Sequence, residues 1–281
     1  MAGGRWFAFF LGLVACKASP AHATGVHRVV SLSPSTTEAL AAIGAVGELV
    51  GRSRYCDYPP EVLGLPVVGG FVDPNFEAIV ALRPDLVTGA RGPAGRQIKD
   101  RLEGLGIATY FPETESLKNI DAMVLGLGSR TAHEAAARQV VDDMHAKEGL
   151  VHATVDALPH PKTLLVFGLG PIVVAGPGSF PDEMLRSAGA ANVVTEGGPY
   201  PTLGMERILA LAPDVVLDAT MQESKGDERI TRDTPGWREV LAVKEGHVVA
   251  LRDEALLRPG PRVGEGIATL ARALHPGLAG P

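Results

Sequence analysis

The sequence predicts an α/β protein with two Rossmann-like lobes, each built on a mostly parallel sheet, joined by a single long α-helix. Three observations predict this fold: a sequence pattern that occurs twice, strands that alternate with helices in both halves, and a helix-forming stretch between the halves. We expect the N-terminal lobe at residues 27–129, the connecting helix at 130–158 and the C-terminal lobe at 160–276.

A repeat defines the two halves of the chain. Residues 77–87 and 206–216 share Glu, Ile, Ala, Leu, Pro, Asp and Val in the same register. A weaker match, with Glu, Leu, Gly and Ala in common, relates residues 38–45 to 183–190. Repeats so far apart are too widely spaced for a solenoid and indicate a duplicated lobe. Chance similarity between common α/β segments is the alternative.

Strands and helices alternate within each half. Residues 28–32 form an apolar run that predicts a strand, and Ser-Thr-Thr-Glu at 35–38 has the spacing of a capping box, which predicts a helix ending near Gly44. The same patterns predict strands at 85–88, 107–110 and 163–167, and helices at 76–82 and 94–105. This order is typical of parallel sheets.

The stretch between the halves, residues 131–158, is rich in helix-forming residues and contains no proline and one glycine. A helix cannot bend without breaking backbone hydrogen bonds, so we expect the lobes to keep a nearly fixed orientation. A cleft between them would be bordered by the loops at the carboxyl ends of the strands, where open α/β sheets bind ligands.

Residues 1–23 have the pattern of a signal peptide. A basic start is followed by an apolar run at 6–15, which is shorter than the roughly 20 residues that span a membrane. Leu-Val-Ala-Cys at 13–16 resembles a lipobox that would lipidate Cys16, whereas Ala-His-Ala at 21–23 suits ordinary cleavage. Both predict a periplasmic or extracytoplasmic protein that touches a membrane, if at all, through a lipid anchor.

Charge and cysteine content exclude two classes. The full chain carries a net charge of −6, and removal of residues 1–23 leaves 24 basic against 32 acidic side chains, or −8, which disfavours a nucleic-acid partner. Cys56 is the one cysteine besides Cys16, so we expect no structural disulfide and a buried, unreactive Cys56.

Two aromatic residues occupy matching places in the repeat. Phe71 lies six positions before Glu77, and Tyr200 lies six positions before Glu206, both in glycine-containing loops. We predict that the two rings face each other across the cleft and sandwich a flat ligand, each contributing roughly 4–6 kcal/mol before ordering costs. The alternative is that they fill gaps between loop and core.

Further candidate ligand contacts lie in other loops. Tyr55 and Tyr58 belong to the turn Tyr-Cys-Asp-Tyr-Pro-Pro, whose prolines fix the backbone, although they could simply anchor that turn. Arg91 and Arg258, with Arg262 in the same segment as Arg258, could bind amide, carboxylate or phosphate oxygens. Solvated arginines are the alternative.

Glu77 and Glu206 each begin a predicted helix, where the helix dipole alone favours a carboxylate. The dipole does not explain why one glutamate recurs on both lobes. We predict that the pair docks onto arginines of a symmetric membrane partner, adding orientation and specificity.

Several segments resemble a known family. Residues 28–38, 56–61, 65–71, 75–85 and 235–237 are similar to the vitamin B12 and ferric-siderophore substrate-binding proteins of ABC importers, the helical-backbone, class III type, and the resemblance covers nearly the whole chain after residue 26. It implies two Rossmann-like lobes, a corrinoid, siderophore or haem in the cleft, and lobe-tip glutamates that pair with permease arginines. On this chain those glutamates fall at Glu77 and Glu206, and the cleft aromatics at Tyr58, Phe71 and Tyr200.

The resemblance also bears on ligand identity. Members best known for cobalamin carry tryptophans where this chain has Phe71, Ala90 and Tyr200. The Cys-Asp-Tyr-Pro-Pro turn, the Gly-Gly-Phe loop and the segment 256–262 are nonetheless closest to that branch, so cobalamin is the expected ligand and a ferric siderophore or haem the alternative. We expect a monomer that delivers its ligand to a permease dimer and its ATPase.

Other functions find less support in the sequence. Histidines 133, 145, 152 and 160 lie on or just after the predicted connecting helix, so we expect no metal site. The chain lacks Gly-x-Ser-x-Gly, Walker and Cys-x-x-Cys motifs, so we expect no catalytic residues, no enzyme activity and no cofactor. A ligand-sensing receptor domain is a further hypothesis for the function.

Overall fold

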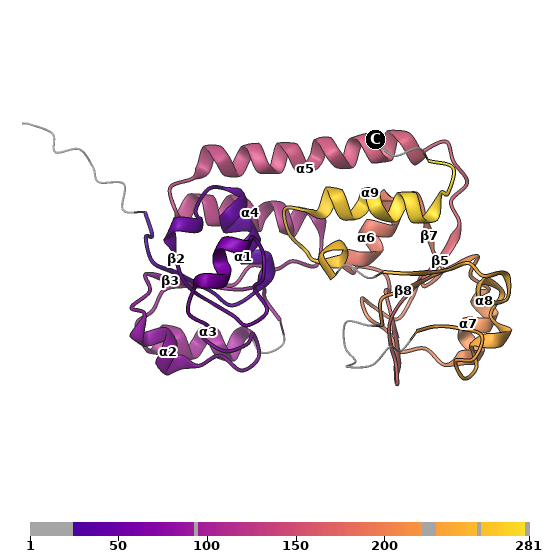
Figure 1. The fold of residues 1–281 in the computed structure, drawn as a ribbon, viewed down its shortest axis with the longest axis horizontal. Coiled ribbons are helices and arrows are strands. Elements are labelled where there is room, and N and C mark those ends of the chain that lie inside the picture. The colour runs from indigo at the N-terminus through magenta and orange to yellow at the C-terminus, as the bar shows by residue number, and fades with distance from the viewer. Residues whose placement is uncertain (1–24, 93–94, 221–228, 252–253, 279–281) are drawn as a thin grey trace, which may run out of the picture.

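The long helix α5 (Glu134–Val155) runs above two lobes that lie side by side (Figure 1). The computed structural model describes residues 25–92, 95–220, 229–251 and 254–278, so the predicted signal peptide with Cys16 lies outside the described residues. Within that range no helix is both long and apolar enough to cross a membrane. The predicted fold class, two α/β lobes joined by a long helix, is confirmed.

The N-terminal lobe is built on a four-stranded sheet with the order β2-β1-β3-β4, in which every described pairing is parallel. Its strands are short and buried, as expected for a sheet covered on both faces. The strands are β1 (Val29–Ser31), β2 (Leu49–Arg52), β3 (Leu86–Thr88) and β4 (Thr109–Tyr110). The helices are α1 (Pro34–Ala42), α2 (Phe76–Ala81), α3 (Gly95–Gly104) and α4 (Leu117–Arg130), with short 3₁₀ turns η1 (Val46–Glu48) and η2 (Pro60–Gly64).

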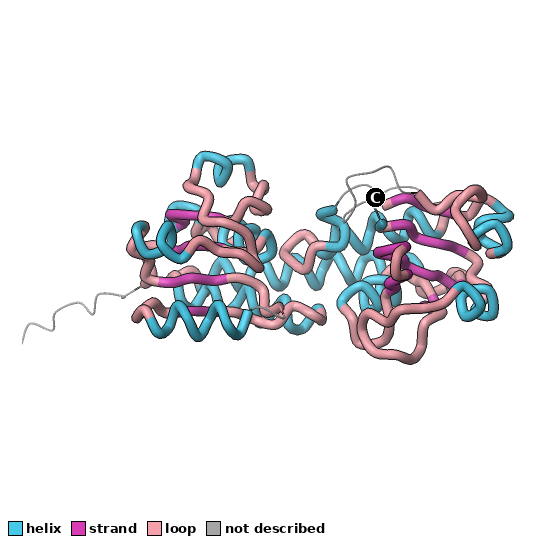
Figure 2. Tube along the Cα trace, turned by 90° about the horizontal axis from the view of Figure 1, so that it is seen from below, coloured by secondary structure: helices cyan, strands magenta, loops and turns pink. Residues whose placement is uncertain are grey.

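The C-terminal lobe has the strand order β6-β5-β8-β9, with β7 pairing β5, and β6 is antiparallel to β5. Figure 2 shows the strands of the two lobes as two separate groups with helices around each. The strands are β5 (Lys162–Leu169), β6 (Ile172–Val174), β7 (Ala191–Asn192), β8 (Val215–Asp218) and β9 (Val248–Ala250). The helices are α6 (Phe180–Ser187), α7 (Met205–Leu211), α8 (Leu241–Glu245) and α9 (Val263–Leu274), with 3₁₀ turns η4 (Trp237–Glu239) and η5 (Glu254–Leu257).

The repeated residues have equivalent structural roles in the two lobes. Asp85 accepts a hydrogen bond from the His27 amide (3.1 Å), just before β1, and Asp214 accepts one from the Lys162 amide (2.9 Å), at the start of β5. Residues 44 and 189, both glycine, follow α1 and α6 with φ of 83° and 78°, as a left-handed helix end requires. This equivalence favours duplication over chance.

The predicted capping box at residues 35–38 is wrong. The N-cap of α1 is Ser33, whose Oγ accepts from the Thr36 amide (3.4 Å), and Pro34 is the first helical residue. Proline suits that position because its fixed φ is helical and its missing N–H would have no intrahelical partner. Glu38 therefore does not cap the helix, and its carboxylate binds Arg258 and Arg262 of the other lobe.

One hydrophobic core is shared by both lobes. It combines the inner faces of the two sheets with α1, α4, α5, α6 and α9, and includes Leu40, Met123, Met144, Leu185 and Leu270, all buried. Separate clusters fill the outer face of each sheet. Because separating the lobes would expose this shared core, burial itself holds them together.

Candidate ligand-binding site

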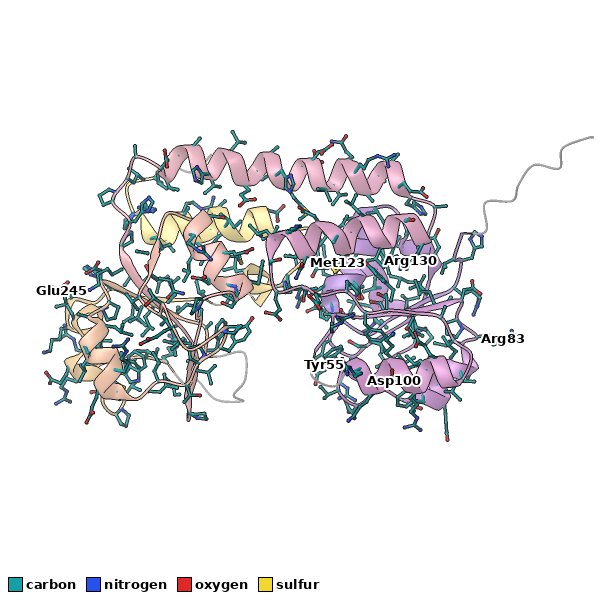
Figure 3. All side chains as sticks on the ribbon, turned by 180° about the vertical axis from the view of Figure 1, so that it is seen from behind. Tyr55, Arg83, Asp100, Met123, Arg130 and Glu245 are labelled. Atoms are coloured by element: carbon teal, nitrogen blue, oxygen red, sulfur yellow. The ribbon has the colours of Figure 1, made fainter. Side chains whose placement is uncertain are left out.

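The site begins at the carboxyl ends of the strands of the N-terminal lobe. Parallel β2, β3 and β4 end at the same edge of the sheet, so the loops that follow them lie close together. These loops carry Tyr55, Arg91 and Glu113. Arg91 Nη1 lies 2.7 Å from Glu113 Oε1, and both side chains are 58% exposed. Tyr55, 53% exposed, lies on the side of this lobe that faces the other lobe (Figure 3).

The Gly-Gly-Phe loop is held against the Tyr55 loop. Arg54 forms a two-bond ion pair with Asp73 (2.9 and 3.2 Å) and lies 5.7 Å from the centre of the Tyr55 ring. Residue 69 must be glycine here, because its φ is 95° and a Cβ would lie 2.6 Å from the backbone oxygen of Asp73. Phe71 is half-buried and packs on Gly92, next to Arg91. Tyr55, Phe71 and Arg91 are therefore brought together. Phe71 also packs on the core cluster of the outer sheet face, so its contact with a ligand stays a prediction.

Tyr200 is the candidate residue of the C-terminal lobe that contacts this part of the N-terminal lobe. Its ring packs edge-to-face on Phe167 of β5, with centroids 5.9 Å apart, and the residue is 46% exposed. Its hydroxyl donates to Glu115 Oε2 across the lobe boundary (3.1 Å). Burial, with a further contribution from the Glu115 carboxylate, raises the pKa of Tyr200 well above its ordinary value.

The segment 113–115 links the two sets of candidates. It follows β4. Its Glu113 accepts a hydrogen bond from Arg91, and its Glu115 accepts one from the Tyr200 hydroxyl. The carboxyl edge of the first sheet therefore borders the lobe that carries Tyr200. This is the surface on which a ligand held between the lobes would contact aromatic rings from both sides.

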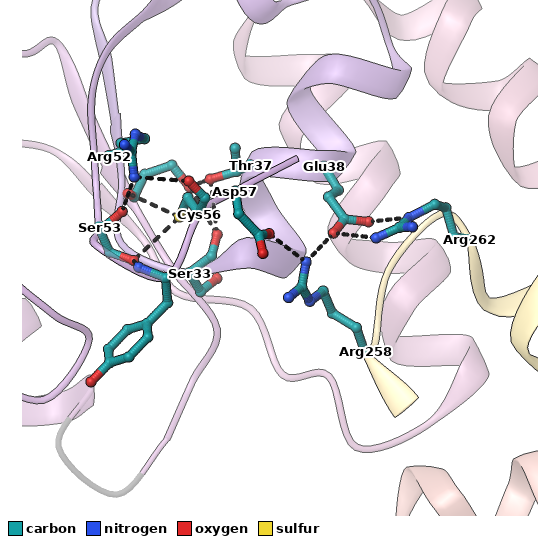
Figure 4. A network of polar contacts seen from close by, with 11 residues as sticks. Ser33, Thr37, Glu38, Arg52, Ser53, Cys56, Asp57, Arg258 and Arg262 are labelled. Atoms are coloured by element: carbon teal, nitrogen blue, oxygen red, sulfur yellow. Dashed lines mark hydrogen bonds and ion pairs between the residues drawn. The ribbon is translucent and has the colours of Figure 1, made fainter. Parts of the chain in front are cut away.

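Arg258 has protein partners instead (Figure 4), and so has Tyr58. Arg258 Nη1 donates to Glu38 Oε1 (2.6 Å) and Asp57 Oδ1 (3.1 Å). Burial opposes the charge of Arg258, but these carboxylates outweigh burial and raise its pKa. The Arg262 guanidinium lies 4.2 Å from the centre of the Tyr58 ring, and Tyr58 lines a pocket of about 310 Å³ facing α5. Ligand contact by Arg258 and Tyr58 stays a prediction.

The loop after β2 is shaped from beneath by buried groups. Arg52, 9% exposed, donates to the carbonyl oxygens of Ser53, Cys56 and Leu63. Cys56 is fully buried, 3.3 Å from Ser53 Oγ, so its expected burial is confirmed. A buried arginine that binds three carbonyl groups fixes the path of the chain on which Tyr55 lies.

The sequence did not reveal Glu115, Phe167 or the role of Glu38. Phe167 lies within an apolar strand and looked like a core residue, and Glu115 occupies an acidic loop with no motif. Glu38 was attributed to a helix cap. Glu38 is the one charged residue of α1, and this was the one signal that could have singled it out.

Glu77 and Glu206 occupy the same place in their lobes. Each is exposed and is the second residue of a short helix, α2 and α7 respectively. Both helices lie on the side of the molecule opposite α5 (Figure 1). Among the described residues, no ion pair involves either carboxylate, so both are accessible to an external cation.

A metal site and an apolar groove are two further kinds of candidate site. Within the described part of the chain, no three His, Cys, Asp or Glu side chains are grouped so that they could hold a metal ion. An apolar groove of about 670 Å³ lies between α5 and α9, lined by Leu150, Val151 and Leu278 among others. It is remote from the strand ends that carry the aromatic rings.

Two lobes braced by a helix, with aromatic side chains from both at their common edge, define a two-lobed solute-binding protein. The chain belongs to the periplasmic binding protein family, whose model matches residues 29–255. It is 29% identical over 237 residues to the vitamin B12-binding protein of Salmonella typhimurium, covering 84% of this chain and 85% of that protein. It is 27% identical to the corresponding protein of Yersinia pseudotuberculosis over 252 residues, or 89% and 86% of the two chains.

Solved structures share the fold over almost their whole length. The periplasmic vitamin B12 binding protein BtuF of Vibrio cholerae superposes with a TM-score of 0.73 at 26% identity, covering 89% of this chain and 96% of that one. A periplasmic heme-binding protein from Pseudomonas aeruginosa superposes with a TM-score of 0.75 at 27% identity, covering 90% and 94%. The comparisons therefore include binding proteins for two macrocycles.

Proposed function

We propose that this chain captures a corrinoid of the cobalamin type between its lobes and delivers it to the permease of an ABC importer. The observation that carries the proposal is sequence similarity over 84% of the chain or more to proteins named for vitamin B12 binding. The site geometry supports it, because Tyr55 and Phe71 on one lobe and Tyr200 on the other offer aromatic surface to a broad ligand.

The charges around the site support a ligand without strong net charge. Arg91 is paired with Glu113, and Arg258 is paired with Glu38 and Asp57, so both candidate arginines already have carboxylate partners. Glu115 adds a negative charge beside Tyr200. A ligand rich in neutral amide groups can accept hydrogen bonds here without displacing an ion pair, whereas carboxylates on a ligand would be repelled by the glutamates.

Haem or a ferric siderophore is the second candidate. It is favoured by the similarity to the solved Pseudomonas aeruginosa heme-binding protein, whose identity to this chain equals that of the Yersinia relative. Haem is also a flat macrocycle, so the aromatic edge alone does not distinguish the two ligands.

We further propose that Glu77 and Glu206 dock the two lobes onto the permease. Their equal positions on α2 and α7, their exposure and the side of the molecule that they share support this role. Two carboxylates on related lobes suit a partner built from two related subunits, because each can meet an equivalent cation.

The proposal includes export and a carrier role. The basic and apolar start of the chain supports export to the periplasm or the outer face of a membrane, with Cys16 as a possible lipid attachment. We propose a monomeric carrier rather than an enzyme, since membership of a binding-protein family supports ligand capture and delivery.

Calorimetric titration tests the ligand. Cyanocobalamin, cobinamide, haem and a ferric hydroxamate are each titrated into the protein under the same conditions. We expect saturable heat with the corrinoids and none with the iron complexes. Binding of haem or the hydroxamate without any response to cyanocobalamin would replace the proposed ligand by the second candidate.

A further inference from the structure

Two repeated glutamates each cross the boundary between the lobes. Glu38 on α1 accepts hydrogen bonds from Arg258 (2.6 Å) and from two nitrogens of Arg262 (2.8 and 2.9 Å), in the C-terminal lobe. Glu183 on α6 accepts one from the Leu117 amide (2.6 Å), in the N-terminal lobe. Glu38 and Glu183 are the residues that match in the second echo of the repeat.

The two contacts are reciprocal in detail. Leu117 is the first residue of α4, the last helix of its lobe, and Arg262 is the N-cap residue of α9, the last helix of the other lobe. Each glutamate on one lobe therefore binds a residue at the start of the last helix of the other, Glu183 through the Leu117 backbone amide and Glu38 through the Arg262 side chain. The Glu183 carboxylate is stabilised by the dipole of α4, and the Leu117 amide is one of the donors that intrahelical bonding leaves free. The Glu38 carboxylate is stabilised by two guanidinium groups instead.

We propose that Glu38 and Glu183 are a pair of positioning residues, the interlobe clasps, that set the angle between the lobes and so the separation of the aromatic rings. The part of this inference that concerns the ligand rests on the proposed function. The part that concerns the lobes does not.

Each clasp is linked to a candidate ligand ring through one intervening contact. Arg258, held by Glu38, also binds Asp57 in the turn that contains Tyr55. Leu117, held by Glu183, lies two residues after Glu115, which accepts the Tyr200 hydroxyl. A change at either clasp would move one side of the aromatic edge relative to the other.

The clasps supply something that the shared core does not. Apolar burial is not directional, so the core holds the lobes together over a range of small rotations. Hydrogen bonds to a carboxylate require defined distances and angles. The Glu38 carboxyl is 3% exposed and lies between two guanidinium groups, so water cannot easily replace its partners.

The angle between the lobes is measured as a distance between two spin labels. Cysteines are introduced at exposed Leu105 in the N-terminal lobe (54% exposed) and Leu241 in the C-terminal lobe (42% exposed). A Cys16→Ala background leaves Cys56, which is fully buried and inaccessible to the reagent. The distance distribution is then recorded for each variant by pulsed electron paramagnetic resonance.

The variants break one clasp, the other, or both. Glu38→Gln keeps the shape of the side chain but turns an amide donor toward one of the arginine donors, and Glu183→Ala removes the acceptor for Leu117. The matched control is Glu265→Ala, which breaks an exposed ion pair between α9 and α5 (Lys147, 3.1 Å) that does not join α1 or α6 to the opposite lobe.

We expect each clasp variant to broaden the distance distribution, the double variant to broaden or shift it most, and the control to match the parent protein. Affinity for cyanocobalamin should fall about tenfold in the double variant, because a wider spread of lobe angles leaves a smaller fraction of molecules in the binding-competent arrangement. Circular dichroism checks that the secondary structure is retained. If Glu38→Gln does not fold, Arg258→Gln, which weakens the clasp but leaves Glu38 paired with Arg262, takes its place. Only its spin-label distances are then compared, because Arg258 is also a candidate ligand contact.

An unchanged distance distribution in the folded double variant would overturn the inference. A parent protein that does not bind cyanocobalamin would contradict the proposed function, while the spin-label distances would still decide on the clasps. Broadening in the control as large as in the clasp variants would also overturn it, because any surface ion pair would then have the same effect.

Discussion

Replacing Tyr200 with alanine should weaken cyanocobalamin binding by about thirtyfold. A tyrosine side chain buries roughly 150–250 Å² when it is fully covered. Tyr200 is 46% exposed, so roughly 70–115 Å² remains for a ligand to cover. At about 25 cal/mol per Å² that area corresponds to about 2 kcal/mol or more, and about 1.4 kcal/mol is a factor of ten in Kd.

The matched variant is Tyr200→Phe. The hydroxyl donates to Glu115 and not toward a ligand, so we expect Tyr200→Phe to stay within about threefold of the parent protein. Leu241→Ala, which removes a comparably exposed apolar side chain from α8, controls for general surface effects. Calorimetry gives all four Kd values. If Tyr200→Ala binds within threefold of the parent, or if Tyr200→Phe loses as much as Tyr200→Ala, the ring does not line the site as argued.

Three further predictions concern docking, pH and the anchor. Substituting Ala for both Glu77 and Glu206 should leave ligand affinity nearly unchanged and abolish stimulation of the cognate importer's ATPase. The control Glu245→Ala on α8 should leave stimulation intact. Full stimulation by the double variant would contradict the docking role. Burial and Glu115 raise the pKa of Tyr200, so as pH rises past about 10 the unfolded chain loses the Tyr200 hydroxyl proton before the folded protein does. The free energy of unfolding should therefore fall above that pH. Denaturant titrations should show a smaller fall for Tyr200→Phe. Substituting Ala at Cys16 should release the protein from membranes, and unchanged fractionation would indicate cleavage after residue 23.

The fold could be predicted because its signals are local. Apolar runs, helix-forming stretches and glycines at helix ends act within a few residues, and the repeat then showed that one lobe occurs twice. Residues 131–158 were expected to be helical, and α5 occupies Glu134–Val155 within that range. The error at Ser35 was also local, since Ser33 and Pro34 formed a competing helix start that the spacing to Glu38 concealed.

The site could be predicted only in part because its contacts are distant in sequence. Aromatic residues in loops were identifiable, since loops rarely need large rings for packing. The partners of those residues were not, because Glu38 and Arg262 are separated by 224 positions and Tyr200 and Glu115 by 85. No periodic pattern connects such pairs, and only the folded arrangement of the two lobes brings them together.

Duplication explains why these distant contacts come in pairs. A lobe that occurs twice carries its glutamates twice, so Glu77 and Glu206 lie on equivalent short helices while Glu38 and Glu183 lie on equivalent helices at the lobe boundary. The first pair is exposed and lies on helices at the side of the molecule opposite α5, and the second pair is bound by the opposite lobe. The surface around a ligand need not keep that symmetry, because a ligand presents different chemistry to each side. On this surface Tyr200 pairs with Glu115 across the lobe boundary, whereas Arg91 pairs with Glu113 within its own lobe.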